Sequence, residues 1–206
     1  GGEGDAGELS LLMPWLLLTL YHLILFRAFY FENPYAYASS ELLEQGYASF
    51  CHLGRELRAG RFLPHDPYYY PDFAGLPFLS SFYPPHMAMA WVATWLPVNL
   101  GWMLYSFTMV AHCWLASVSV YILATSIGIA PLTAGFASVT LSTLGYALKQ
   151  NSCIVYTLTW VPILLLTASA HMWVIFGTSL GLMLLAGYWP IAIPATGLGC
   201  LVWLLH

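Results

Sequence analysis

The feature that most constrains this chain is a long segment without charge. From Pro77 up to Lys149 no residue is charged, and over all 206 residues 60% are hydrophobic and only 7% are charged. Globular proteins average about 25% charged residues, so this chain lacks the polar groups to cover a water-exposed surface. We therefore expect membrane lipid to be its main solvent. Five Lys and Arg residues without a cluster also exclude nucleic acid as a partner.

The cysteines suggest no disulfide framework, and the acidic residues Glu3, Asp5 and Glu8 predict that the first hydrophobic stretch is a retained span rather than a secretory signal. Cys51, Cys113, Cys153 and Cys200 are far apart and form no CxxC pair, so we interpret them as small hydrophobic residues. The chain begins at Gly1 without an initiator Met and stops inside an apolar run. We therefore expect residues 1–206 to be a single, incomplete membrane domain of a longer protein.

Apolar stretches of membrane-spanning length recur along the chain. A bilayer core about 30 Å thick needs about 20 apolar residues per helix. The first stretch covers residues 9–31, and residues 77–206 supply the others, near 98–126, 132–148, 154–168, 172–185 and from 190 onward. The pattern predicts an all-α fold, a polytopic transmembrane helix bundle of about five to seven spans.

The only segment suited to water is a loop over residues 32–76, which carries six acids and three arginines. Within it Leu43, Tyr47, Phe50 and Leu57 recur at helical spacing with charges between them. We predict an amphipathic helix over about residues 41–59, lying along the membrane surface. Gly60 stands where a C-terminal cap would.

Two acids at the start of this helix are candidate catalytic groups. Glu41 and Glu44 are three residues apart, so they share a helix face and a carboxylate of the pair could act as a general base. The alternative is that both only complement the positive end of the helix dipole.

The arginines of the same helix suggest a phosphate partner. Arg55, Arg58 and Arg61 recur every three residues, which places guanidinium groups on adjacent turns where they could bind the phosphate of a lipid. The alternative is general anchoring to anionic headgroups. Glu56 is a candidate ion-pair partner for one of the three.

A rigid run of polar and aromatic residues, His65-Asp66-Pro67-Tyr68-Tyr69-Tyr70-Pro71-Asp72, follows in the loop. Tyrosines with acids and an imidazole suit a hydroxyl-rich ligand such as a sugar, and an ordinary interfacial aromatic belt is the alternative. His65, Asp66 and His86 could instead bind a divalent metal, but their spacing matches no standard metal site. The sequence therefore assigns no metal ligand, and a divalent cation stays an alternative cofactor.

Seven short motifs occur in a fixed order. Those in the loop are Glu41-Leu42-Leu43-Glu44-Gln45, Gly54-Arg55-Glu56-Leu57-Arg58-Ala59-Gly60-Arg61, Pro64-His65-Asp66-Pro67-Tyr68 and Gly75-Leu76-Pro77-Phe78. The later ones are Phe82-Tyr83-Pro84-Pro85, Thr159-Trp160-Val161-Pro162 and Leu185-Ala186-Gly187-Tyr188-Trp189-Pro190. The ordered set resembles the bacterial YfhO-like membrane proteins over residues 10–206. One departure is His65-Asp66, where that family usually has Trp-Asn.

That family is similar to the GT-C class of glycosyltransferases, which move a sugar from a polyprenyl-phosphate carrier to an acceptor outside the cytoplasmic membrane. The resemblance implies a hexosyltransferase of the bacterial inner membrane, with a cell-envelope lipid, glycan or protein as acceptor. In the class, an acid just after the first span acts as base. Glu41 matches that position best, and Glu44 is the alternative. Arg55, Arg58 or a bound metal would stabilise the departing phosphate.

The sequence leaves two alternatives open, one for the side of the membrane that the first loop faces and one for the function. The resemblance places the first loop in the periplasm or cell exterior, whereas the arginine count read by the positive-inside rule favours the cytoplasm. His112 and Lys149 lie in or beside apolar stretches, where ionisable groups often mark a transport path. A transporter or an envelope-assembly scaffold is therefore the competing interpretation.

Overall fold

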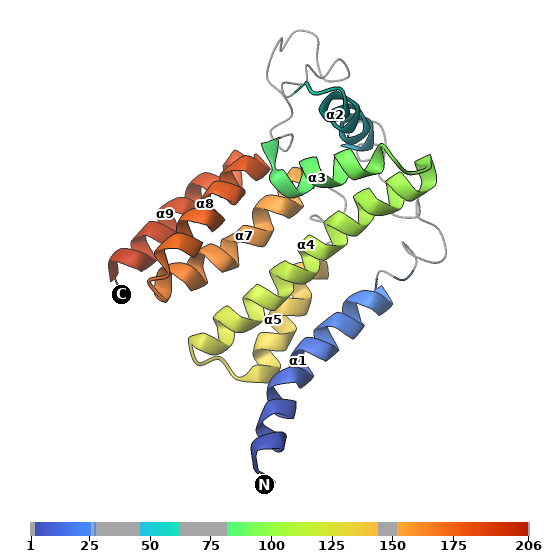
Figure 1. Ribbon diagram of the computed structural model, residues 1–206. Coiled ribbons are helices and arrows are strands. Elements are labelled where there is room, and N and C mark those ends of the chain that lie inside the picture. Colours follow the sequence, from blue (N-terminus) through green and yellow to red (C-terminus); the bar gives the residue numbers. More distant parts are fainter. Residues whose placement is uncertain (1–2, 26, 28–45, 62–81, 144–151, 206) are drawn as a thin grey trace.

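The chain folds into α-helices throughout the part that the structure describes, which confirms the predicted all-α class. The computed structural model describes residues 3–25, 27, 46–61, 82–143 and 152–205. Labelled as in Figure 1, the helices are α1 (Glu3–Leu25), α2 (Ala48–Arg58), α3 (Pro84–Ala93), α4 (Val98–Ser126), α5 (Pro131–Thr143), α7 (Ser152–Ser169), α8 (Trp173–Ala186) and α9 (Trp189–Leu205).

The helix ends follow the prolines and glycines of the sequence. The helix α4 occupies Val98–Ser126 as expected, with Pro97 at its N-cap and Gly128, at a φ of 86°, just beyond its end. Gly187 ends α8 in the left-handed conformation, which glycine adopts without strain. The first helix differs from expectation, because it begins at Glu3 rather than Leu9 and includes Pro14.

Five of the helices form an up-and-down array. In Figure 1, α4, α5, α7, α8 and α9 run alternately down and up, and α1 lies beside α4 and α5. The helix α7 packs against α4, α8 and α9. The short helix α3 lies across one end of this array, and α2 packs on α3. The turns after α4 and α7 lie at the opposite end.

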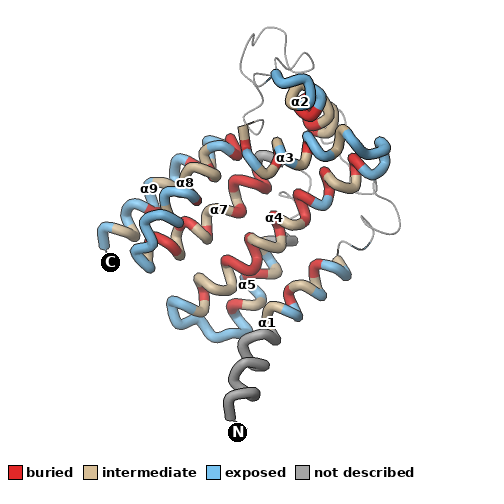
Figure 2. Tube along the Cα trace, in the orientation of Figure 1, coloured by how far each residue is buried: buried red, intermediate tan, exposed pale blue. Residues whose placement is uncertain are grey.

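The outer sides of the array are apolar. Figure 2 shows buried residues along the facing sides of α4 and α7 and exposed residues along α8, α9 and α1. Large hydrophobic side chains are exposed there, including Leu16, Phe136, Val174 and Leu204 at 64, 68, 82 and 71%. Among the described helices α4 alone is long and apolar enough to cross a membrane, and the other apolar helices are shorter. The number of spans therefore stays a prediction.

Candidate functional site

The helix α2 is amphipathic and docks closely on α3. Phe50 and Leu53 are fully buried in the core beneath it. At Gly54 the two backbones meet, because a Cβ placed there would overlap the carbonyl oxygen of Ala90 and lie 2.8 Å from Cγ2 of Thr94. Only glycine allows this approach. Of the amphipathic helix predicted over about residues 41–59, the structure shows Ala48–Arg58, and residues 41–45 lie outside the described part.

The C-terminal end of α2 confirms the predicted cap. Gly60 adopts a φ of 73°, its amide donates to the carbonyl of Leu57 at 3.0 Å, and the amide of Arg61 donates to Glu56 at 2.9 Å. This pair of bonds is a Schellman motif. The side chain of Arg61 then returns to Glu56, donating from Nε at 2.5 Å and from Nη2 at 2.8 Å. The hydrogen bonds from Arg61 lower the pKa of the Glu56 carboxyl.

The three arginines of this segment have different surroundings. Arg61 is paired with Glu56. Arg58 lies over the ring of Trp95, 4.1 Å from its centroid, and donates from Nη1 to the carbonyl of Thr94 at 3.2 Å. It thereby ties α2 to the end of α3. Arg55 is exposed and has no ion-pair partner within the described ranges. Of the two predicted phosphate ligands, Arg55 is thus the more available.

A buried hydrogen-bonded cluster lies where α3, α4 and α7 meet. Nδ1 of His112 is 2.6 Å from the carbonyl of Thr108, so Nδ1 carries the proton and Nε2 accepts a bond from the hydroxyl of Tyr83 at 2.6 Å. The indole of Trp160 donates to the same tyrosine oxygen at 2.9 Å. Tyr83 is fully buried, and burial raises the pKa of its hydroxyl. His112 therefore bonds across helices.

A second imidazole extends this cluster toward α2. Nδ1 of His86 lies 3.2 Å from the hydroxyl of Tyr156, whose ring stacks on Tyr83 at 5.0 Å between centroids. The ring of Phe50 meets His86 edge-on at 5.1 Å. Burial, and to a lesser degree the nearby His112, lowers the pKa of His86 to about 3. The ring is neutral at physiological pH, and α2 rests on it through Phe50.

Three motifs that carry the resemblance meet at this end of the array. Tyr83 belongs to the aromatic-proline motif, and Trp160, which donates to it, belongs to the Trp-x-Pro motif. The amide of Tyr188, in the third motif, donates to the hydroxyl of Thr157 at 3.2 Å. Segments far apart in sequence are thus joined by hydrogen bonds near α2 and α3.

Most of the predicted catalytic and ligand-binding side chains lie outside the described residues. They are Glu41, Glu44, His65, Asp66, Tyr68, Tyr69 and Asp72, together with Lys149. Of the alternative metal ligands, His86 is described and faces Tyr156. The described residues contain no group of three or more His, Cys, Asp or Glu side chains that could hold a metal.

Two residues that join helices, His22 and Gly54, were not among the residues predicted from the sequence. His22 of α1 is buried, with Nδ1 2.7 Å from the carbonyl of Leu18 and Nε2 3.4 Å from the hydroxyl of Ser117 on α4. The rule that singled out His112, an ionisable group in an apolar stretch, would have found it. Gly54 gives no such signal, since its role depends on α3.

The chain was compared with protein-family models, with curated proteins and with solved structures. None of the three comparisons finds a match.

Proposed function

We propose that this protein is a multi-pass membrane glycosyltransferase that transfers a sugar from a polyprenyl-phosphate carrier to an acceptor of the cell envelope. The observation that carries the proposal is the position of α2. It is an amphipathic, arginine-bearing helix docked on α3 at one end of an apolar helix array. The candidate bases Glu41 and Glu44 come shortly before it in the chain. This arrangement suits a reaction at the membrane surface.

The distribution of polar and apolar groups supports a membrane location. The described helices α3, α4, α5, α7, α8 and α9 contain no charged residue, and their outer sides expose large hydrophobic residues. Tryptophan pairs stand at both ends of the array. Trp91 and Trp95 lie by α2, with ring centroids 6.1 Å apart, and Trp173 and Trp203 lie at the opposite end, 4.5 Å apart. Tryptophan favours the two interfaces of a bilayer. We place the α2 end on the periplasmic or outer side of a bacterial inner membrane.

The proposed reaction is a direct displacement at the anomeric carbon of the donor sugar. Glu41 or Glu44 removes the proton from the acceptor hydroxyl, whose oxygen forms the new glycosidic bond. The bond between the anomeric carbon and the carrier phosphate breaks, and the polyprenyl phosphate leaves with the electron pair. A cation stabilises that leaving group. Arg55 is the better placed arginine for this task, since Arg58 already contacts Thr94 and Trp95.

The test is sugar transfer from a panel of polyprenyl-phosphate sugars by the full-length protein in lipid. Wild type is compared with Glu41→Gln and Glu44→Gln, and folding of each variant is checked by circular dichroism and gel filtration. Glu56→Gln is the matched control, because this carboxylate pairs with Arg61 and has no part in the proposed reaction. We expect one of the first two changes to abolish transfer and the control to retain it.

Retained transfer in both variants would remove the general-base role. If folded wild-type protein transfers no sugar from any donor, the enzyme proposal fails and the transporter or scaffold interpretation takes its place. Within the described residues no observation favours that alternative. Both ring nitrogens of His112, its one described candidate group, are within hydrogen-bond distance of protein atoms.

A further inference from the structure

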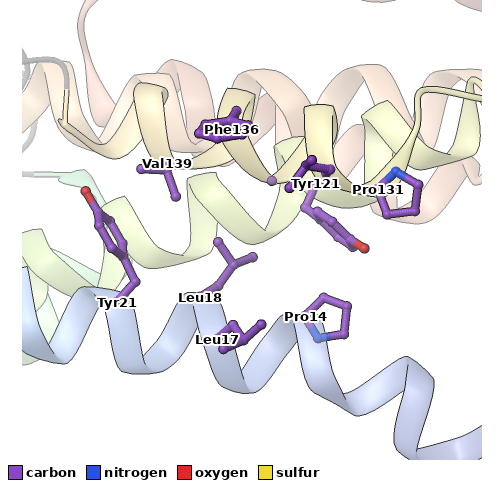
Figure 3. Close-up of a pocket in the computed structure, with 10 residues that line it drawn as sticks. Pro14, Leu17, Leu18, Tyr21, Tyr121, Pro131, Phe136 and Val139 are labelled. Carbon is purple, nitrogen blue, oxygen red and sulfur yellow. The ribbon is translucent and has the colours of Figure 1, made fainter.

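An apolar groove separates α1 from α5, with α4 forming its floor. Its volume is about 770 Å³, which is within the usual range of about 300–1,000 Å³ for small-ligand sites. In Figure 3, Leu18 of α1 and Val139 of α5 point toward one another across it. The phenol of Tyr121 lines its floor, and Phe136 lines the α5 side. Apart from tyrosine hydroxyls the lining side chains are hydrocarbon.

Within the described residues, the first helix is attached to the array on one side only. It packs on α4 and α5, and two side-chain contacts join it to α4. The indole of Trp114 donates to the hydroxyl of Thr19 at 3.1 Å, and Ser117 lies 3.4 Å from Nε2 of His22. Its other side exposes leucines, Leu16 at 64% among them. In a bilayer, lipid would reach the groove directly.

The dimensions of the groove select a narrow occupant. An α-helix with its side chains is about 10–12 Å across. Because α1 and α5 approach to within 8 Å between Cα atoms where they touch, the groove is too narrow there for a helix. The groove extends along α5 from Pro131 to Val139, about 12 Å at 1.5 Å per residue. One leaflet of the hydrocarbon core is about 15 Å deep, so a single lipid tail matches its length.

We propose that a hydrocarbon tail of a bilayer phospholipid occupies this groove and holds α1 against α4 and α5. The tail comes from the leaflet opposite α2, because the Pro131 end of the groove lies at that end of the array. This inference rests on the proposed membrane location of the helices. It does not depend on sugar transfer.

The experiment uses the full-length protein in nanodiscs of phosphatidylcholine that carries a photoactivatable diazirine on one acyl chain. Cross-linked residues are identified by mass spectrometry. We expect labelling at Leu17 and Phe136 several-fold above that at Leu204, an exposed residue on the outer side of α9. Gly135→Leu fills the groove, since a Cβ at this position meets no atom within 4 Å. This variant should reduce the labelling of Leu17 and Phe136 to the level of Leu204.

The matched control is Gly177→Leu on α8, whose Cβ also meets open space and which lies outside the groove. It should leave the labelling pattern unchanged. If Gly135→Leu does not fold, Leu17→Trp at the groove edge serves instead, with labelling then read at Phe136. Equal labelling of the groove and of α9 would contradict the proposal that a lipid tail occupies the groove, but it would be consistent with the membrane location of the helices. No labelling at any site would overturn both.

Discussion

Replacing Gly54 by alanine should loosen α2 from α3. The added methyl group would overlap the backbone oxygen of Ala90 and crowd Thr94, and a backbone carbonyl cannot rotate aside as a side chain can. Overpacking of this kind costs about 1–3 kcal/mol. Alanine recovers about 1 kcal/mol of it through better helix propensity. We expect the upper part of the range, so the docking of α2 should lose about 1–2 kcal/mol.

Hydrogen exchange of the α2 amides measures this loss locally. A loss of 1–2 kcal/mol corresponds to a factor of about 5–30 in the population of the open state, so exchange within α2 should accelerate by that factor. Gly177→Ala is the control, because its methyl group meets open space and should stabilise α8 by about 0.5–1 kcal/mol. Wild-type exchange of α2 in Gly54→Ala, together with a thermal midpoint that rises as in the control, would contradict the close contact at Gly54.

Two further predictions concern the buried cluster. Tyr83→Phe removes the hydroxyl that bonds to Nε2 of His112 and to the indole Nε1 of Trp160, and leaving such buried groups unpaired costs about 1–3 kcal/mol each. The thermal midpoint in detergent should fall, and an unchanged midpoint would contradict these bonds. For His86, burial lowers the pKa to about 3, whereas an unfolded histidine titrates near pH 6.5. Its contribution to stability is therefore complete above about pH 6.5 and declines toward pH 3 by about 1.4 kcal/mol per pH unit, or about 2 kcal/mol at pH 5. Midpoints measured at pH 7.5 and 5 should fall less in His86→Gln than in wild type, and equal falls would contradict a neutral buried ring.

The sequence allowed the helices to be predicted because their limits are local. Pro97 and Gly128 bracket α4, and Gly60 ends α2, as the structure confirms. Proline and glycine act through the backbone of their own neighbourhood, so the signal is present before any tertiary contact forms. The pairing of Glu56 with an arginine is predictable for the same reason, since Arg61 is only five residues away in the sequence.

The contacts between helices could not be predicted in this way. The guanidinium of Arg58 contacts Trp95 and Thr94, and Thr94 is 36 residues away in the sequence. Gly54 reads as an ordinary helix glycine until α3 is placed against it. The helical type of the elements follows from periodicity, whereas their partners follow from how those elements pack.

The contacts between helices distinguish the residues that position α2 from the residues that would react in the proposed transfer. Tyr83 and Trp160 bond to each other inside the array, so they hold the helices in place and have no part in the proposed reaction. A change at Tyr83 or Gly54 would disturb α2, and with it transfer, without touching a reacting group. Loss of transfer in Glu41→Gln or Glu44→Gln therefore argues for a base only if α2 exchanges hydrogen at the wild-type rate in the same variant.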